Sequence, residues 1–369
     1  MILTAEQKCL LWLSSAEIAA GHVWDLLACY GSAQAVWDAF GGANGPAFRG
    51  KAQETLARLH SRAAIDDLIA GVEKKNVRLL FSTDEAYPQQ LRCIQAPPYL
   101  LYCAGRLSCL QMPMVALVGA RRASRYGMDM AAMLSRGLCE AGVCIVSGLA
   151  RGIDSAAHQA ALDAQGHTVG VLGSGIDTPY PPENTPMLRK IAGGIGLVIS
   201  EYPLGAEPAA FHFPHRNRLI SGLSNGVVFV EGKIRSGGMH TVNAALDQGR
   251  EVFAVPGHVG TEGSEGPHLI LREGARIVTS AQDLLEDLGL AFCAASSPKK
   301  NAEAASELTA LQKSIVAALR IEPLYLEELA SRLGVDASLL IGELGTLEIA
   351  GWICRQAGNR FGLPLLAGQ

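Results

Sequence analysis

Basic residues are concentrated in four short stretches of the central sequence, in a pattern expected of a phosphate-binding site. The 369-residue chain has a formal net charge of −4, so the clustering is local. The stretches hold eight Lys and Arg residues against two acids, and they are 119–127 (GARRASRYG), 148–154 (GLARGID), 214–218 (PHRNR) and 231–238 (EGKIRSGG). Arginine offers paired N–H donors to phosphate oxygens, and glycine permits close backbone approach. We therefore expect a phosphate-bearing ligand, either a nucleotide or a strand of nucleic acid.

Residues 112–290 must position these stretches, and they read as repeated units of an apolar β-branched run, a Gly-rich loop and a helix-like segment. Continuous apolar strands alternating with helices predict an α/β fold, a Rossmann-like doubly wound and mostly parallel sheet. Ligands bind such sheets beyond the carboxyl ends of the strands. We expect all four basic stretches to be loops at that edge. The predicted strands are MVALVG, VCIVSG, TVGVLG, GLVISEYP, GVVFVEG and EVFAVPG.

The flanking sequence predicts smaller domains. Residues 1–75 have apolar positions at helical spacing, and residues 76–111 read as an extended bridge into the sheet. Residues 291–306 have linker composition, and residues 307–369 read as three helices and a hairpin, the order of a winged helix. From residue 308 on, five basic and six acidic residues make that domain poorly suited to neutralising DNA phosphates.

Other candidate chemistry is weaker. His212 and His215 lack further ligands at zinc spacing, so we expect no metal and no cofactor. Asp154 and His158 could form an acid/base pair, but a helix cap is the simpler interpretation of Asp154. Glu201, Tyr202 and Glu231 could move protons, but hydrogen bonding to loop backbone is the simpler interpretation, and no catalytic triad can be read from spacing. Nine cysteines without CxxC spacing favour reduced thiols in a cytoplasm, and no apolar run reaches the roughly 20 residues that span a bilayer.

At these residues the chain resembles the DNA-processing protein family called DprA, also Smf. The resemblance covers about residues 76–280, and it is carried in order by VALVGARRASRYG, IVSGLARGIDSAAHQAAL, VGVLGSGIDTPYPPEN, ISEYPLGAEPAAFHFPHRNRLISGLSNGVVFVEG, SGGMHTVNAALDQGREVFAVPG and GPHLILREGARIV. It implies a protein that binds and protects incoming single-stranded DNA, loads RecA recombinase during natural transformation, forms a homodimer and performs no catalysis. It also implies an N-terminal SAM-like helical domain and a C-terminal winged helix.

The basic stretches and this resemblance together predict a DNA-contact set. Phe211 or Phe213 could add a face on which a base stacks. Two departures affect the set: Ala120 stands where the family usually has serine, and SGGMHT replaces a more usual Ser-Gly-Ser-Leu. The predicted contacts are Gly119, Arg121, Arg122, Ser147, Gly148, Arg151, Arg216, Asn217, Arg218, Lys233, Ser236 and Gly237.

Two other functions were weighed. A nucleoside-phosphate phosphoribohydrolase of the "lonely guy" type shares the broad fold, but alignment of its motif on Ser236–Thr241 places its glutamate at Ala244. A double-stranded DNA regulator would act through the winged helix, yet the candidate recognition segment ASLLIGELGTLEIAG has no Lys or Arg to reach base edges.

Overall fold

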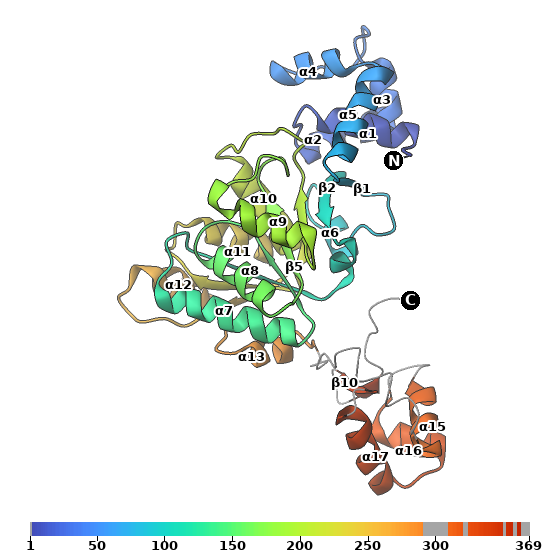
Figure 1. The fold of residues 1–369 in the computed structure, drawn as a ribbon, viewed down its shortest axis with the longest axis vertical. Coiled ribbons are helices and arrows are strands. Elements are labelled where there is room, and N and C mark those ends of the chain that lie inside the picture. Colours follow the sequence, from blue (N-terminus) through green and yellow to red (C-terminus); the bar gives the residue numbers. More distant parts are fainter. Residues whose placement is uncertain (1, 291–308, 320–323, 350–351, 357–359, 363–369) are drawn as a thin grey trace. The chain divides into compact units, whose positions relative to one another are not determined.

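The computed structural model describes residues 2–290, 309–319, 324–349, 352–356 and 360–362 (Figure 1). Chain contacts divide it into two compact units. The first contains Met1–Cys139 and Val143–Thr279, and the second contains Glu140–Gly142 and Ser280–Gln369. Within the described residues, no helix is both long and apolar enough to cross a membrane.

A nine-stranded sheet forms the centre of the first unit, in the order β1-β2-β6-β5-β4-β3-β7-β8-β9. Strands from β6 to β9 in this order pair in parallel, whereas β1 and β2 are antiparallel additions at one edge. The mostly parallel Rossmann-like prediction is confirmed. The bounds are β1 Arg78–Phe81, β2 Leu100–Gly105, β3 Met114–Gly119, β4 Cys144–Ser147, β5 Thr168–Leu172, β6 Leu197–Ser200, β7 Gly226–Glu231, β8 Glu251–Ala254 and β9 Arg276–Ile277.

The segment 76–111 is therefore more than an extended bridge, since it supplies β1 and β2 to the sheet. Tyr102 of β2 pairs with Ser200 of β6 in register. Leu79–Phe81 and Leu100–Cys103 are buried without a break, and successive side chains pack alternately in two core clusters, so both faces of these strands are covered by the rest of the unit.

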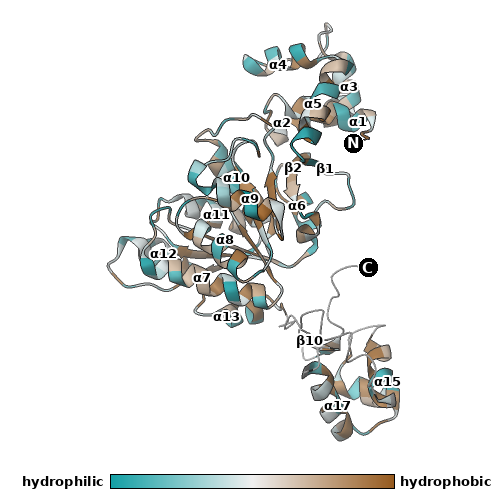
Figure 2. Cartoon of the chain, viewed as in Figure 1, coloured by the Kyte–Doolittle hydropathy of each residue, from teal (hydrophilic) through white to brown (hydrophobic). Residues whose placement is uncertain are grey.

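Helices cover both faces of the parallel strands. Leu219 of α10 and Val242 of α11 pack in one core cluster with Val171 and Ile199. Leu172 and Val198, their neighbours along β5 and β6, point to the opposite face and pack with α9 in a second cluster. Figure 2 shows hydrophobic colour along the central strands. The helices are α7 Arg125–Glu140, α8 Ile153–Asp163, α9 Thr185–Gly193, α10 His212–Leu223, α11 Gly237–Asp247 and α12 Glu265–Arg272, with short turns α6 Gln89–Arg92, η1 Leu107–Gln111, η2 Pro182–Asn184 and η3 Glu262–Ser264.

Five N-terminal helices belong to the same compact unit as the sheet. Their core surrounds Trp12, whose indole donates to Leu56 O at 3.0 Å. Ser14 and Tyr102 share a buried hydroxyl hydrogen bond of 2.7 Å, which joins α1 to β2. The bounds are α1 Ala5–Ser14, α2 Ala20–Tyr30, α3 Ala33–Ala39, α4 Lys51–Leu59 and α5 Arg62–Lys74.

In the described part of the second unit, three helices and a two-stranded antiparallel hairpin follow α13 Ala281–Asp287. They enclose a core that includes Ile315, Leu329 and Leu344. This is the order predicted for a winged helix, while the predicted linker 291–306 lies outside the described residues. The bounds are α15 Ala310–Leu319, α16 Leu326–Leu333, α17 Ala337–Ile349, β10 Cys354–Gln356 and β11 Arg360–Gly362.

Candidate functional site

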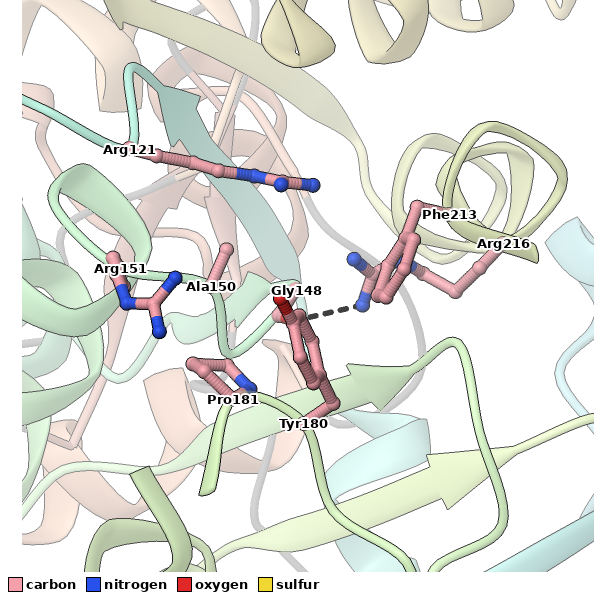
Figure 3. A pocket seen from close by; sticks show the side chains of 8 residues that line it. All are labelled: Arg121, Gly148, Ala150, Arg151, Tyr180, Pro181, Phe213 and Arg216. Carbon is pink, nitrogen blue, oxygen red and sulfur yellow. Dashed lines mark hydrogen bonds between the residues drawn. The ribbon is translucent and has the colours of Figure 1, made fainter. Parts of the chain in front are cut away.

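A cleft of about 830 Å³ lies at the carboxyl ends of β3 and β7. Its walls come from the loops after these strands, from α10, from the first turn of α11 and from the segment after β8. A smaller pocket adjoins it, where Arg121 extends toward Phe213 and Tyr180 (Figure 3). The cleft is at the sheet edge where the sequence predicted a ligand site.

The loop after β3 presents two exposed arginines. Gly119 allows this geometry because a Cβ there would lie 2.6 Å from Glu231 O and 2.7 Å from Ile153. Arg121 and Arg122 are exposed, and the Arg121 guanidinium lies 5.5 Å from the centre of the Phe213 ring. The loop therefore directs two cations at the cleft, and one of them lies over the ring of Phe213 from α10.

Arg216 lines the cleft but is only 4% exposed. Its Nη1 donates to Gly148 O at 2.8 Å and also to Val171 O, and its Nε donates to Asn217 Oδ1 at 3.2 Å. Burial lowers the pKa of Arg216 to about 10, and the Asp154 carboxylate opposes that shift. A Cβ on Gly148 would lie 2.7–2.9 Å from the guanidinium, so glycine makes room for it. Most of this arginine's donors are already used within the protein.

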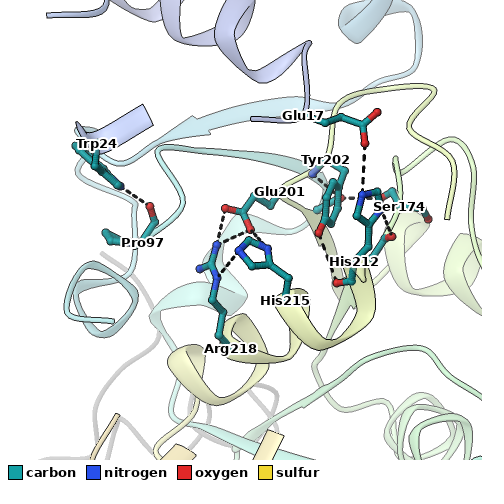
Figure 4. A network of polar contacts seen from close by, with 11 residues as sticks. Glu17, Trp24, Pro97, Ser174, Glu201, Tyr202, His212, His215 and Arg218 are labelled. Atoms are coloured by element: carbon teal, nitrogen blue, oxygen red, sulfur yellow. Dashed lines mark hydrogen bonds and ion pairs between the residues drawn. The ribbon is translucent and has the colours of Figure 1, made fainter. Parts of the chain in front are cut away.

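Arg218 lies outside the lining of the cleft. Its Nη2 donates to both carboxylate oxygens of Glu201, at 2.6 and 2.7 Å, and His215 adjoins the pair (Figure 4). Burial raises the pKa of Glu201, and Arg218 works against that rise. The stretch 214–218 was predicted as a loop, which is wrong: it belongs to α10, which begins at His212 and tolerates Pro214 in its first turn.

Two acids of the site bind backbone amides. Asp154 Oδ2 accepts from Gly148 N at 3.0 Å and from Ala150 N at 3.3 Å, and burial raises its pKa. Glu231 accepts from the backbone N and the hydroxyl of Ser124, at 3.0 and 2.6 Å, close to the start of α7. Hydrogen bonding to loop backbone is confirmed for Glu231. The helix cap predicted at Asp154 is wrong, because its carboxylate accepts from amides that precede α8, and Glu201 binds Arg218 instead of loop backbone.

The remaining predicted contacts differ in accessibility. Arg151 is exposed and pairs with Glu183, and Lys233 is exposed and pairs with Glu262. Asn217 Nδ2 donates to Gly237 O at 3.2 Å, which ties α10 to the first turn of α11. Ser236 lines the cleft, and its Oγ is buried with no hydrogen-bond partner among the described residues. The structure therefore brings these residues to one edge.

Ser147 is the exception among the loop residues. It is fully buried as the last residue of β4, and its hydroxyl donates to Leu117 O at 2.7 Å. Its position is behind the cleft rather than in the lining.

Of the two aromatic candidates, only one lines the cleft. Phe213 lines both the cleft and the smaller pocket, and its ring centre lies 5.5 Å from that of Tyr180. Phe211 is 72% exposed and lines neither. Tyr180, Glu183 and Glu262 were not predicted, although TPYPPEN and GTEGSEG follow predicted strands and therefore belong to loops at the same edge.

The two histidines form no metal site. His212 Nδ1 donates to Gly173 O at 3.2 Å, and the His212 ring lies 3.5 Å from Glu17 and stacks on Tyr202. His215 lies 3.7 Å from Glu201. No cluster of three or more His, Cys, Asp or Glu suited to a metal occurs within the described ranges.

Comparison with known proteins identifies matching families for both units. The model of the DNA recombination-mediator protein A family matches residues 78–289, and that of the DprA winged helix domain matches residues 299–359. Protein Smf of Escherichia coli is 38% identical over 301 residues, covering 81% of this chain and 80% of the relative. DNA processing protein DprA of Streptococcus pneumoniae is 44% identical over 223 residues, covering 60% and 78%.

Solved structures agree. The X-ray structure of DNA processing protein A from Streptococcus pneumoniae has a TM-score of 0.66 at 36% identity, covering 78% of this chain and 99% of that one. DNA processing protein A from Helicobacter pylori, whose structure concerns its single-stranded DNA binding mode, has a TM-score of 0.53 at 29% identity, covering 57% and 95%.

Proposed function

The chain belongs to the DNA recombination-mediator protein A family, and from this premise we propose that its cleft binds single-stranded DNA and that the protein delivers the strand to RecA recombinase. The observation that carries the proposal is a row of cations at the carboxyl edge of the sheet. Arg151 follows β4, Arg121 and Arg122 follow β3, and Lys233 follows β7, and these three strands are adjacent.

Phosphates of one strand can follow such a row while a base stacks on an aromatic ring, which is how sequence-tolerant single-strand binding works. Phe213 supplies that ring within the same cleft, with Arg121 over its face. Arg216, Asn217 and Gly148 form the floor, and Ser236 and Gly237 offer a hydroxyl and backbone N–H groups at the start of α11. Arg218 is left out of this contact set, because Glu201 already binds it.

The cleft holds DNA without cleaving it. Asp154 and Glu231 both accept hydrogen bonds from the loops that they position, so neither is free to act as a general base. Ala244, where the phosphoribohydrolase motif requires glutamate, supplies no carboxylate. Release of free base from a nucleoside monophosphate by the purified protein would contradict a purely binding role.

The family role further includes a homodimer acting in the cytoplasm. The cysteines that the structure describes form no disulfide with one another, which supports that compartment. The winged helix fits protein contact better than DNA contact. Its α17 exposes Leu339 and Ile341 and contains no Lys or Arg.

The test is a titration of labelled single-stranded oligonucleotide and of duplex of the same length, read by fluorescence anisotropy. Wild-type protein should prefer the single strand, and added salt should weaken binding steeply. Arg121→Glu combined with Arg122→Glu should abolish most binding without lowering the melting temperature, because both side chains are exposed. Arg136→Glu is the matched control, since Arg136 is an exposed arginine of α7 that does not line the cleft. Equal affinity of the double variant and wild type would refute the site.

A further inference from the structure

The cations of the cleft and of the smaller pocket beside it lie between two carboxylates, one on each side. Along the sheet, the order β5-β4-β3-β7-β8 places the loops of five neighbouring strands side by side. Glu183 follows β5 and Glu262 follows β8, so the acids flank the row. The cations come from the three strands between them.

Each outer cation is bound to the carboxylate beside it. Arg151 Nε donates to Glu183 Oε1, with the two side chains 50% and 48% exposed. Lys233 Nζ donates to Glu262 Oε2. The hydrogen bond from Arg151 lowers the pKa of Glu183, and the hydrogen bond to Glu262 raises the pKa of Lys233. In the free protein, a carboxylate therefore lies at each place where an outer cation would hold a phosphate.

Glu231, in contrast, is a carboxylate that hydrogen bonds and packing hold in place in this cleft. It accepts three hydrogen bonds from Ser124, and its side chain fills the space beside Gly127 and Gly263, where a Cβ would lie within 2.6 Å of it. Glu183 and Glu262 are exposed and make no such packing contacts in the described structure. They can leave their partners without disturbing a loop.

We propose that Glu183 and Glu262 compete with DNA phosphates for Arg151 and Lys233, so that binding a strand exchanges both ion pairs for phosphate contacts. This inference rests on the proposed function of the cleft. Strands β4 and β7 are two strand spacings apart, about 10 Å, so one phosphate cannot replace both carboxylates. The phosphates of a DNA strand can bind both cations, whereas the phosphate of a single nucleotide can bind at most one. The two glutamates thereby set affinity and favour a strand over a lone nucleotide.

The experiment removes each competing charge and measures single-strand affinity. Glu183→Gln and Glu262→Gln should each tighten binding of labelled oligo(dT) by about two- to fivefold, as expected for loss of an exposed ion pair, with unchanged melting temperature. The double variant should combine both gains. Glu265→Gln is the matched control, because this exposed acid in the first turn of α12 acts on Lys233 through space without an ion pair that the structure describes.

Double-mutant cycles separate competition from a general charge effect. Glu262→Gln should tighten binding in the wild-type background but not beside Lys233→Met, and Glu183→Gln should lose its effect beside Arg151→Met. The competition proposal would be overturned if affinity still rose without the cation, if Glu265→Gln raised affinity equally, or if neither variant raised affinity. A wild-type protein that binds no oligo(dT) would instead refute the proposed function itself, so the two failures are distinguishable.

Discussion

Arg216 and Arg122 line the same cleft, yet their charges are held in different ways. Arg216 is buried in α10 and gives its donors to the carbonyls of Gly148 and Val171. Arg122 is exposed in the loop after β3. One arginine therefore belongs to the framework that shapes the cleft, and the other is available to a ligand. Residue type alone does not separate the two; burial and existing partners do.

The largest effect should come from removing the buried guanidinium. Arg216→Met takes a donor from each of two carbonyls and leaves the buried Asp154 without its nearby positive charge. Breaking a buried charge interaction in this way costs about 3–5 kcal/mol of unfolding free energy, measurable by urea denaturation. Arg122→Met is the control and should change stability by less than about 0.5 kcal/mol. If Arg216→Met folds as stably as wild type, the framework role is refuted.

The fold and the edge location could be predicted from sequence because both depend on local pattern. Apolar runs such as GVVFVEG read directly as buried parallel strands, and the loops after them must lie at one edge. The partners of charged side chains could not be read in this way. Arg218 meets Glu201 across 17 positions, and Arg216 meets Val171 across 45, through packing that sequence periodicity does not contain.

The start of α10 illustrates the same limit. Proline, histidine and arginine in PHRNR suggested a loop, but a helix accepts proline in its first turn, where the missing N–H is not needed. Likewise, Glu183 and Glu262 came from loops without basic residues, so a search for cations overlooked the acids that bind them.

The next effect is a loss of folding stability in acid, caused by a buried histidine of α8. His158 of α8 is fully buried and hydrogen-bonds Thr168 Oγ1 at 2.7 Å, and burial together with the nearby Arg216 charge lowers its pKa to about 3. In the unfolded chain this imidazole is protonated below about pH 6.5, whereas in the folded chain it stays neutral. Stability due to this group is present above pH 6.5 and falls by about 1.4 kcal/mol per pH unit below it, down to about pH 3.

The measurement is unfolding free energy against pH for wild type and His158→Gln, which keeps a polar side chain for Thr168. The variant should be less stable near neutral pH and should have a shallower slope between about pH 6 and 4. Parallel slopes for the two proteins would show that His158 titrates normally and is not held neutral by burial.

Substituting the exposed Arg122 should change stability least, but it should clearly change how DNA affinity depends on salt. Arg122→Ala should leave the melting temperature unchanged because the side chain makes no buried contact. If Arg122 binds one phosphate, the slope of log affinity against log salt should fall in magnitude by about 1. Arg136→Ala, an equal loss of charge on α7 outside the cleft lining, should leave that slope unaltered. An unchanged slope for Arg122→Ala would mean that this arginine stays in solvent even when DNA is bound. The division between framework and ligand-binding arginines would then rest on Arg121, which contacts Phe213.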